Sequence, residues 1–385
     1  MSWGDFGTLR NQNALEYECF RAVAHGARVC IGDQLHPSGM LDEAVYKRIG
    51  NVFGSIECKE PWLVNTKKVC DVGVVIPKSP MDTDPKAGDI VTQGVYLVLS
   101  ELHIPFDFVN YEDEVDSYKL IILPDEVILT DEMTKKINSY MENGGKVLAT
   151  GKSGYDFNNN RMLLQGLPIS KLKISEAEER YIIAEGNLLN DIPNMDHYLY
   201  ERSYDIEVLQ NASILTYAKP SYFNRAWNHF CSHRQAPIDR NAKRTPIIVE
   251  GENEIFIAAP LFTDYAKNGY LVHKDIIRQC IDRLMTQPIV KTNLPSTSEI
   301  AVRKQGRDII IHVLNYSIQR KSKSIDTIEC KQTVVDKEIC IKTLCPPKNV
   351  LKIPEKKELT FEYQDGYTIL RLDKLAGHDM FVIQI

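Results

Sequence analysis

The chain has 385 residues, of which 43% are hydrophobic and 25% charged, and its formal net charge is −6 at pH 7. This length allows two or three domains, and the composition is that of an ordinary globular protein. Lys and Arg form no stripe that would mark a nucleic-acid interface, and no apolar run approaches the roughly 20 residues that a membrane helix needs.

The first 64 residues read as two strand–helix units. The expected elements are strands at 2–3 and 28–31 and helices at 11–25 and 41–58, where apolar residues recur at helical spacing. In barrels built of such repeats, active-site residues lie on the loops that follow the strands. That rule selects Trp3 and Asp5 after the first strand, and Asp33 and His36 after the second.

These four residues are suited to glycoside hydrolysis, which needs one carboxyl group to protonate the leaving oxygen and another to act as nucleophile or base. Asp5 and Asp33 are therefore the catalytic candidates. Trp3 is a candidate to stack on a sugar face, and His36 to bind a substrate hydroxyl. The alternative is that both aspartates cap the loops or helices that follow them.

The segment 69–150 has the pattern of a complete α/β layer. We expect strands at 71–76, 106–109, 120–123 and 146–150, and helices at 89–103 and between Thr130 and Gly144. Thr130 is a good N-cap, and the Gly144-Gly145 pair is a typical helix exit. Alternating strands and helices with short links predict a doubly wound parallel sheet, which a strand at 254–259 and a helix at 270–285 would close near residue 290.

The turn Gly151-Lys-Ser-Gly154 follows the strand at 146–150, where a nucleophile elbow stands in other α/β enzymes. It contains no Cys, and Ser153 would need a His base that the sequence does not place. The turn also lacks the glycine spacing of a phosphate loop. We interpret it as a structural turn and expect no cofactor.

The less regular segment 160–245 contains an aromatic-rich loop whose polar residues are Asn228, His229, His233 and Arg234. These four are candidates to contact a ligand or a neighbouring subunit. Packing of the aromatic side chains is the alternative. A metal site at the two histidines and Cys231 is disfavoured, because no further ligand is indicated.

From residue 298 the hydrophobic period changes to two, which predicts a small antiparallel β-sandwich. The expected strands are 300–303, 308–314, 333–342, 349–353, 359–363, 367–372 and 379–385. The nine cysteines of the chain are scattered and contain no Cys-x-x-Cys pair, so we expect a reducing compartment such as the cytoplasm, or the periplasm if a signal peptide lies upstream.

Two stretches carry a family resemblance. From about residue 72 to 285, the segments GVVIP, GVYLVLSELHIPFDFV, KLIILPDEVILTDEMTKKINSYMENGGKVLATGKSG, YFNRAWNHFCSH and IFIAAPLFTDYAKNGY resemble the β-galactosidase trimerisation domain. That module is similar to a class I glutamine amidotransferase without the catalytic Cys. Residues 2–50 resemble the last two β/α units of the catalytic barrel in glycoside hydrolases of the β-galactosidase-like or α-L-fucosidase-like kind.

The resemblance implies an α/β chain of three parts. Residues 1–64 would be the end of a (β/α) barrel, residues 65–292 a flavodoxin-like or amidotransferase-like domain, and residues 297–385 the β-sandwich. It implies a homotrimer that acts on an oligosaccharide or glycoside, with the chain alone inactive or nearly so. In the β-galactosidases a Glu nucleophile stands where this chain has Asp5. The alternative is a non-catalytic oligomerisation or carbohydrate-binding module.

Overall fold

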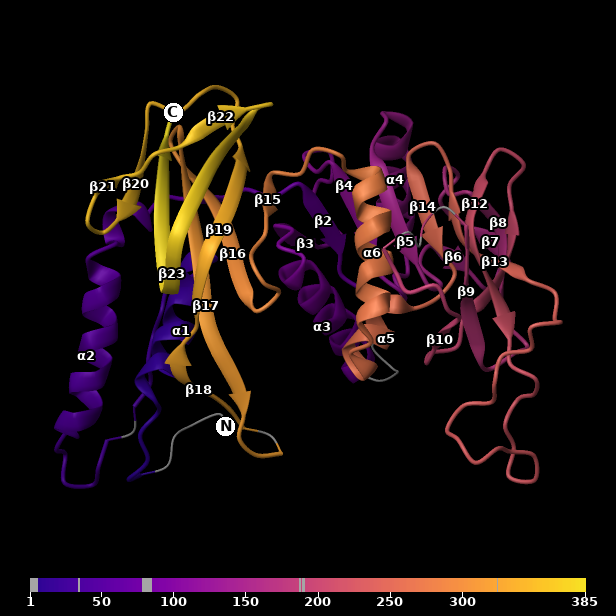
Figure 1. Ribbon diagram of the computed structural model, residues 1–385, viewed down its shortest axis with the longest axis horizontal. Helices are drawn as coiled ribbons and strands as arrows, with labels where there is room; N and C mark the ends of the chain where they lie inside the picture. The colour runs from indigo at the N-terminus through magenta and orange to yellow at the C-terminus, as the bar shows by residue number, and fades with distance from the viewer. Residues whose placement is uncertain (1–5, 34, 78–84, 187, 189–190, 324) are drawn as a thin grey trace. The chain divides into compact units, whose positions relative to one another are not determined.

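The computed structural model describes residues 6–33, 35–77, 85–186, 188, 191–323 and 325–385. The chain divides into two compact units, each described below by itself (Figure 1). Unit 1 consists of Met1–Cys70, His103–Pro105 and Pro288–Ile385. Unit 2 consists of Asp71–Leu102 and Phe106–Gln287.

Unit 2 contains the predicted parallel sheet. Its five parallel strands lie in the order β3-β2-β4-β5-β14, which is the 2-1-3-4-5 order of flavodoxin-like folds. Their bounds are β2 Val72–Val75, β3 Phe106–Val109, β4 Leu120–Leu123, β5 Lys146–Thr150 and β14 Glu254–Ile257. Buried strands are expected in a parallel sheet covered on both faces, and every residue of β2, β4 and β14 is buried. The predicted doubly wound sheet is thus confirmed.

The segment that looked irregular in sequence extends this sheet with antiparallel strands in the order β14-β13-β12-β9-β10. Their bounds are β9 Arg180–Gly186, β10 His197–Leu199, β12 Ser213–Pro220 and β13 Thr245–Glu250, and two small separate sheets pair β6 Tyr155–Asp156 with β7 Arg161–Met162 and β8 Ile169–Ile174 with β11 Tyr204–Val208. Register shifts in β12 break the period of two, which is why the pattern did not reveal it.

Among the described residues of unit 2 there are four α-helices. They are α3 Pro85–Glu101, α4 Asp131–Glu142, α5 Leu261–Asn268 and α6 Leu271–Leu284. The predicted cap of α4 is confirmed, because the Thr130 side chain accepts a hydrogen bond from the Met133 amide at 3.3 Å. Gly144 follows the helix with φ +83°, a conformation that favours glycine.

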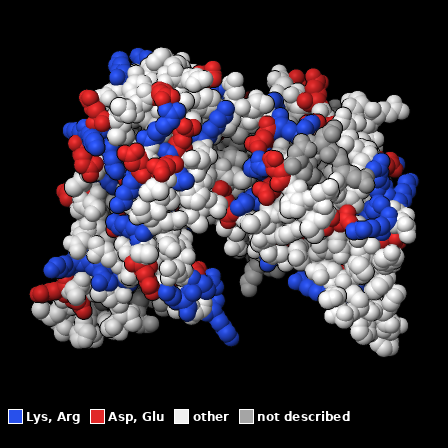
Figure 2. Space-filling model, in the orientation of Figure 1, with Lys and Arg blue, Asp and Glu red and all other residues white. Residues whose placement is uncertain are grey.

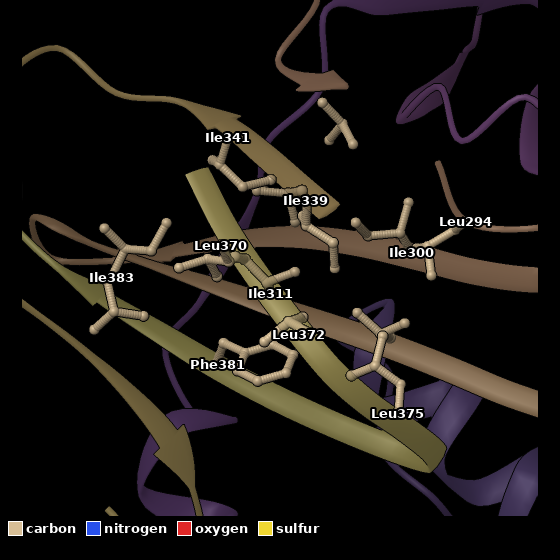
Figure 3. Close-up of a cluster of buried hydrophobic side chains, with 14 of the residues drawn as sticks. Leu294, Ile300, Ile311, Ile339, Ile341, Leu370, Leu372, Leu375, Phe381 and Ile383 are labelled. Atoms are coloured by element: carbon tan, nitrogen blue, oxygen red, sulfur yellow. The ribbon is translucent and has the colours of Figure 1, made fainter. Parts of the chain in front are cut away.

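Unit 1 is built around antiparallel strands that share β23, an 18-residue strand. Its first half pairs with β19 and β22, and its second half pairs with β17 and β20. The strands are β1 Lys67–Lys68, β15 Val290–Thr292, β16 Ser298–Gln305, β17 Asp308–Arg320, β18 Asp326–Lys331, β19 Thr333–Lys342, β20 Asn349–Ile353, β21 Lys357–Glu358, β22 Glu362–Gln364 and β23 Tyr367–Gln384. Figure 3 shows their apolar side chains meeting in one core, among them Ile311, Leu370 and Phe381.

The remaining part of unit 1 is helical. It contains α1 Gln12–Ala24, α2 Glu43–Glu57 and the short 3₁₀ helix η1 Glu60–Trp62. Both expected helices are present, whereas the expected strand at 28–31 is wrong: these residues form no ladder, and Val29 packs in a cluster with Ala14 and Phe20 of α1. A lone extended segment cannot satisfy its backbone groups as a strand, because a strand needs a neighbour to pair with. The strand expected at 2–3 lies outside the described residues.

The surface carries both signs of charge. On the face shown in Figure 2, positive and negative side chains alternate over both units, as the composition suggests. Among the described residues, no helix is long and apolar enough to cross a membrane.

Candidate functional site

A cavity of about 830 Å³ in unit 1 contains two of the predicted site residues. Its walls come from the loop before α1, the segment 31–42 and the first turns of α2, and Asp33 and His36 both line it. Trp3 and Asp5 lie outside the described residues, so the structure places one of the two predicted carboxyl groups.

The carboxylate of Asp33 is exposed and, among the described residues, accepts no hydrogen bond. The helix that follows is capped instead by Asp42, whose side chain accepts from the amides of Ala44 and Val45 at 2.9 and 3.3 Å. The geometry therefore gives Asp33 no capping role at α2.

His36 is oriented by the turn in which it lies. Its Nδ1 accepts a hydrogen bond from the Ser38 amide at 3.2 Å and lies 2.8 Å from Ser38 Oγ. Because Nδ1 acts as an acceptor, the neutral ring carries its proton on Nε2. The edge of the ring contacts Phe6, with 6.0 Å between centroids. Nε2–H is thus left as the hydrogen-bond donor of the neutral ring.

Most of the remaining cavity wall is apolar. Leu35, Met40 and Leu41 line it and are exposed, as is Phe6. The two arginines of the wall are partly engaged: Arg48 Nη1 donates to the carbonyl of Arg10 at 2.5 Å, and Arg10 is paired with Glu18. Apolar walls with a few polar groups are typical of ligand pockets, and they equally suit contact with a further protein surface.

The other four predicted site residues belong to unit 2 and lie on the segment 222–235, which we call the rim loop. The stem of this loop is fixed by hydrogen bonds. Asn224 accepts from the Glu178 amide at 2.8 Å and donates to the Glu176 carbonyl at 2.8 Å. At the other end, the Ala236 amide donates to Glu179 at 2.7 Å.

The histidines of the rim loop are not arranged as metal ligands. The His229 ring stacks on Phe223, with centroids 4.1 Å apart. The Cys231 thiol donates to the carbonyl of Gln235 at 3.2 Å. No group of three potential metal ligands occurs in the part of the chain that the structure describes.

Three aromatic side chains of the rim loop point into solvent. Trp227 is 89% exposed, Phe230 65% and Tyr222 59%. Large aromatic residues with this exposure, held on a rigid stem, are unusual on a surface that contacts only water. They are enriched at protein interfaces, where they bury much area at a small cost in conformational entropy.

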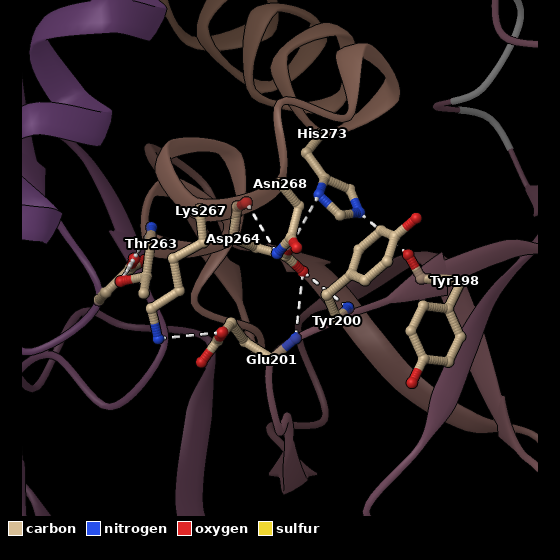
Figure 4. A network of polar contacts seen from close by, with 9 residues as sticks. Tyr198, Tyr200, Glu201, Thr263, Asp264, Lys267, Asn268 and His273 are labelled. Atoms are coloured by element: carbon tan, nitrogen blue, oxygen red, sulfur yellow. Dashed lines mark hydrogen bonds and ion pairs between the residues drawn. The ribbon is translucent and has the colours of Figure 1, made fainter. Parts of the chain in front are cut away.

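A polar network connects the end of β10 and the residues after it to α5 and α6 (Figure 4). The Arg234 guanidinium lies 5.6 Å from the Tyr200 ring centroid. The buried Asp264 carboxylate accepts from the Tyr200 amide at 2.9 Å and from Asn268 at 2.9 Å, and His273 lies 3.2 Å from the Tyr198 carbonyl oxygen. The sequence analysis did not single out Asp264, whose only local signal is its place in the first turn of α5.

The comparisons with known proteins agree with the expected resemblance. Residues 87–176 match the family described as the β-galactosidase trimerisation domain. Among curated relatives, β-galactosidase LacZ of Lactobacillus acidophilus is 26% identical over 192 residues, and LacZ of Heyndrickxia coagulans is 30% identical over 191 residues. Each match covers 44% of this chain and 29% of the relative, so the chain spans less than a third of these enzymes' length.

Among solved structures, the α-L-fucosidase isoenzyme 2 from Paenibacillus thiaminolyticus superposes with a TM-score of 0.91 and 30% identity, over 99% of this chain and 58% of that one. A β-galactosidase from Rahnella sp. R3 superposes with a TM-score of 0.62 and 16% identity, over 100% of this chain and 53% of that one, and this shows the shared fold alone. Residues 87–176 therefore carry the trimerisation-domain signature, and the predicted resemblance of the chain to glycoside hydrolases of the β-galactosidase and α-L-fucosidase kind is confirmed.

Proposed function

We propose that this chain is the part of a glycoside hydrolase that carries one side of the sugar site, and that the enzyme acts on α-L-fucosides. The observation that supports this most is the likeness to the α-L-fucosidase, which extends over 99% of the chain and thus includes the cavity. The LacZ sequence matches cover 44% of the chain, and the Rahnella β-galactosidase superposes over the whole chain at only 16% identity, so β-galactosides are the second choice.

In this proposal Asp33 and Asp5 supply the carboxyl groups that hydrolysis needs, His36 donates to a sugar hydroxyl, and Trp3 stacks on the sugar face. The chain by itself is expected to show no turnover, or nearly none. Measurable release of nitrophenol from an aryl α-L-fucoside or aryl β-galactoside by the purified chain would contradict that expectation. The nine cysteines, all free thiols, support a reducing compartment such as the cytoplasm.

A chimera tests the proposed activity. The region of the Paenibacillus fucosidase that matches this chain is replaced by it, and the purified chimera is assayed on both aryl glycosides. Asp33→Asn is expected to lower kcat/KM at least 100-fold, whereas His36→Gln is expected to raise KM, because it weakens substrate binding.

Asp42→Asn is the matched control, since it also changes an aspartate of the cavity wall and Asn caps helices as well as Asp does. A chimera that hydrolyses neither glycoside, or one in which Asp33→Asn is as active as Asp42→Asn, would contradict the proposal.

We further propose that the rim loop contacts a second copy of the chain in a homotrimer. Its exposed aromatics and rigid stem support an interface, and the trimerisation-domain match supports a copy of the same chain as the partner. The same contact would serve the alternative function, in which the chain is a non-catalytic assembly module. Asn228, His229, His233 and Arg234 would then face the neighbouring subunit.

Light scattering across a concentration series tests the assembly. Loss of a central interface Trp costs about 2 kcal/mol or more, so Trp227→Ala is expected to weaken association at least 30-fold. Leu344→Ser is the control, because Leu344 is fully exposed but belongs to unit 1, whereas the rim loop belongs to unit 2. A wild-type monomer at micromolar concentration would refute the assembly proposal and leave the sugar site untouched.

A further inference from the structure

Three basic side chains meet in the interior of unit 1, where the helical segment lies against the sheet. Lys59 follows α2, His312 lies on β17 and His378 on β23, and their exposed fractions are 7%, 0% and 8%. Lys59 Nζ lies 3.0 Å from His378 Nδ1, and His378 Nε2 lies 3.0 Å from His312 Nδ1. We call this group the basic joint.

Phe20 of α1 covers the basic joint. Its ring stacks on the His378 imidazole with centroids 4.1 Å apart, and Lys59 Nζ lies 4.4 Å from its centroid. Phe20 is 1% exposed. The joint therefore connects both helices of the segment 6–64, which carries the cavity, to two strands of the sheet.

The hydrogen bonds of the joint run in one direction. An ammonium group only donates, so His378 Nδ1 must accept from Lys59. His378 then carries its proton on Nε2 and donates to His312 Nδ1. That leaves the proton of His312 on Nε2, for which no described residue provides an acceptor. Both imidazoles are thus neutral, and each has its accepting nitrogen already occupied.

The charged groups around the joint do not favour an additional proton. Those that face it are Glu16 on α1, His25 just after α1, Arg303 on β16, Lys331 on β18, Glu355 after β20 and Asp379 on β23. Two of the carboxylates are paired elsewhere: Glu16 with Lys331 at 2.6 Å and Asp379 with Lys352 at 2.7 Å. A protonated imidazole would therefore lie beside the Lys59 cation without a carboxylate in contact.

Burial and the positive charges around the joint both lower the pKa values of the two histidines. Burial, with Arg303, Lys59 and His25, lowers the pKa of His312 from 6.5 to about 3. Burial and the Lys59 charge also hold the pKa of His378 well below its ordinary value. Burial lowers the pKa of Lys59 to about 8, so this side chain is charged at lower pH.

We propose that the basic joint is an acid-sensitive contact that holds the cavity-bearing segment 6–64 on the sheet and releases it when the imidazoles are protonated. Each histidine binds a proton more readily in the released form than in the docked form. The part of this stability that depends on the two histidines is therefore fully present above about pH 6.5, the pKa of an ordinary His, and is lost as the pH falls below it. This inference does not depend on the identity of the sugar or on the trimer.

Hydrogen exchange of α1, followed by mass spectrometry, tests the joint in the full chain. Between pH 7.5 and 5.5 the opening constant of α1, corrected for the intrinsic pH dependence of exchange, is expected to rise about tenfold if one imidazole is protonated on release and about 100-fold if both are.

The double variant His312→Gln/His378→Gln cannot gain these protons and is expected to lose the pH response, whereas His233→Gln in unit 2 is expected to keep it. An opening constant that changes less than threefold in the wild type, or a response that persists in the double variant, would overturn the proposal. If the double variant fails to fold, NMR of the wild-type imidazoles decides: titration of His312 and His378 between pH 5.5 and 7.5 in the docked state would overturn it as well.

Discussion

Replacement of Gly94 by alanine tests how closely α3 and α5 pack in unit 2. Gly94 lies in the middle of α3, and a Cβ added there would be 2.1 Å from the Phe262 carbonyl oxygen and 2.6 Å from its carbonyl carbon. Real Cβ atoms essentially never come within 3.0 Å of another atom. The added Cβ would lie 2.1 Å from the Phe262 oxygen, so the backbones of α3 and α5 must separate by at least 0.9 Å, the difference between 3.0 and 2.1 Å. The obstacle is backbone, which cannot rotate away as a side chain could.

This separation determines how much stability the Gly94→Ala variant loses. Opening a packed contact by 0.5–1 Å forfeits roughly a quarter to a half of its dispersion energy, and overpacked interiors typically lose about 1–3 kcal/mol. Alanine recovers up to about 1 kcal/mol through its higher helix propensity. We expect Gly94→Ala to lower the free energy of unfolding of unit 2 by about 2 kcal/mol, which corresponds to a fall of about 4–8 °C in Tm.

Urea titration read by hydrogen exchange reports the two units separately and provides a control of opposite sign. Gly54 lies inside α2, and an added Cβ there meets nothing within 4 Å. Gly54→Ala should therefore stabilise α2 by up to about 1 kcal/mol. Equal stabilisation by the two replacements would refute the close contact between α3 and α5.

Three further predictions concern unit 2. Thr130→Ala removes the cap of α4 and should cost about 1 kcal/mol in urea unfolding, whereas Thr130→Ser should restore most of it. Ser153 is fully buried, and its Oγ accepts a hydrogen bond from the Val127 amide at 3.1 Å. Ser153→Ala should therefore lower the free energy of unfolding by about 1–3 kcal/mol and leave the glycosidase activity of the folded chimera unchanged. A selective loss of activity would instead support Ser153 as a nucleophile. Burial raises the pKa of Asp125 from 3.8 to about 6, so the native state keeps a proton that the unfolded chain loses between these values. The stability of unit 2 should therefore fall by about 3 kcal/mol as the pH rises through this window, and the difference between wild type and Asp125→Asn should show it; a flat difference would contradict it.

Local sequence patterns were sufficient for the elements whose stability is local. The parallel strands and α4 appear where hydrophobic runs and the Thr130 cap indicated them, because periodicity and capping act within a few residues. Asp33 and His36 share a cavity for a similar reason, since they are three residues apart on one segment. For these elements, the predicted and observed bounds differ by only a few residues at the ends.

The antiparallel extension of unit 2 and the continuity of β23 depended on partners far along the chain. Two strands were expected where β23 runs unbroken past Gly377, because its two halves pair with different strands, β19 and β17. The strand expected at 28–31 is wrong for the converse reason. Val29 packs on α1, and no strand among the described residues pairs with this segment.

The sequence by itself thus determined the class of fold, the parallel sheet and the group of polar residues beside α2. Only the tertiary structure decided that Lys59, His312 and His378 meet and that the rim loop holds its aromatics in solvent. The physical reason is the range of the interactions. Hydrogen-bonded turns and helix caps depend on residues adjacent in sequence. Burial and the pairing of charges depend on segments far apart in the chain, as with Lys59 and His378, which are more than 300 positions apart.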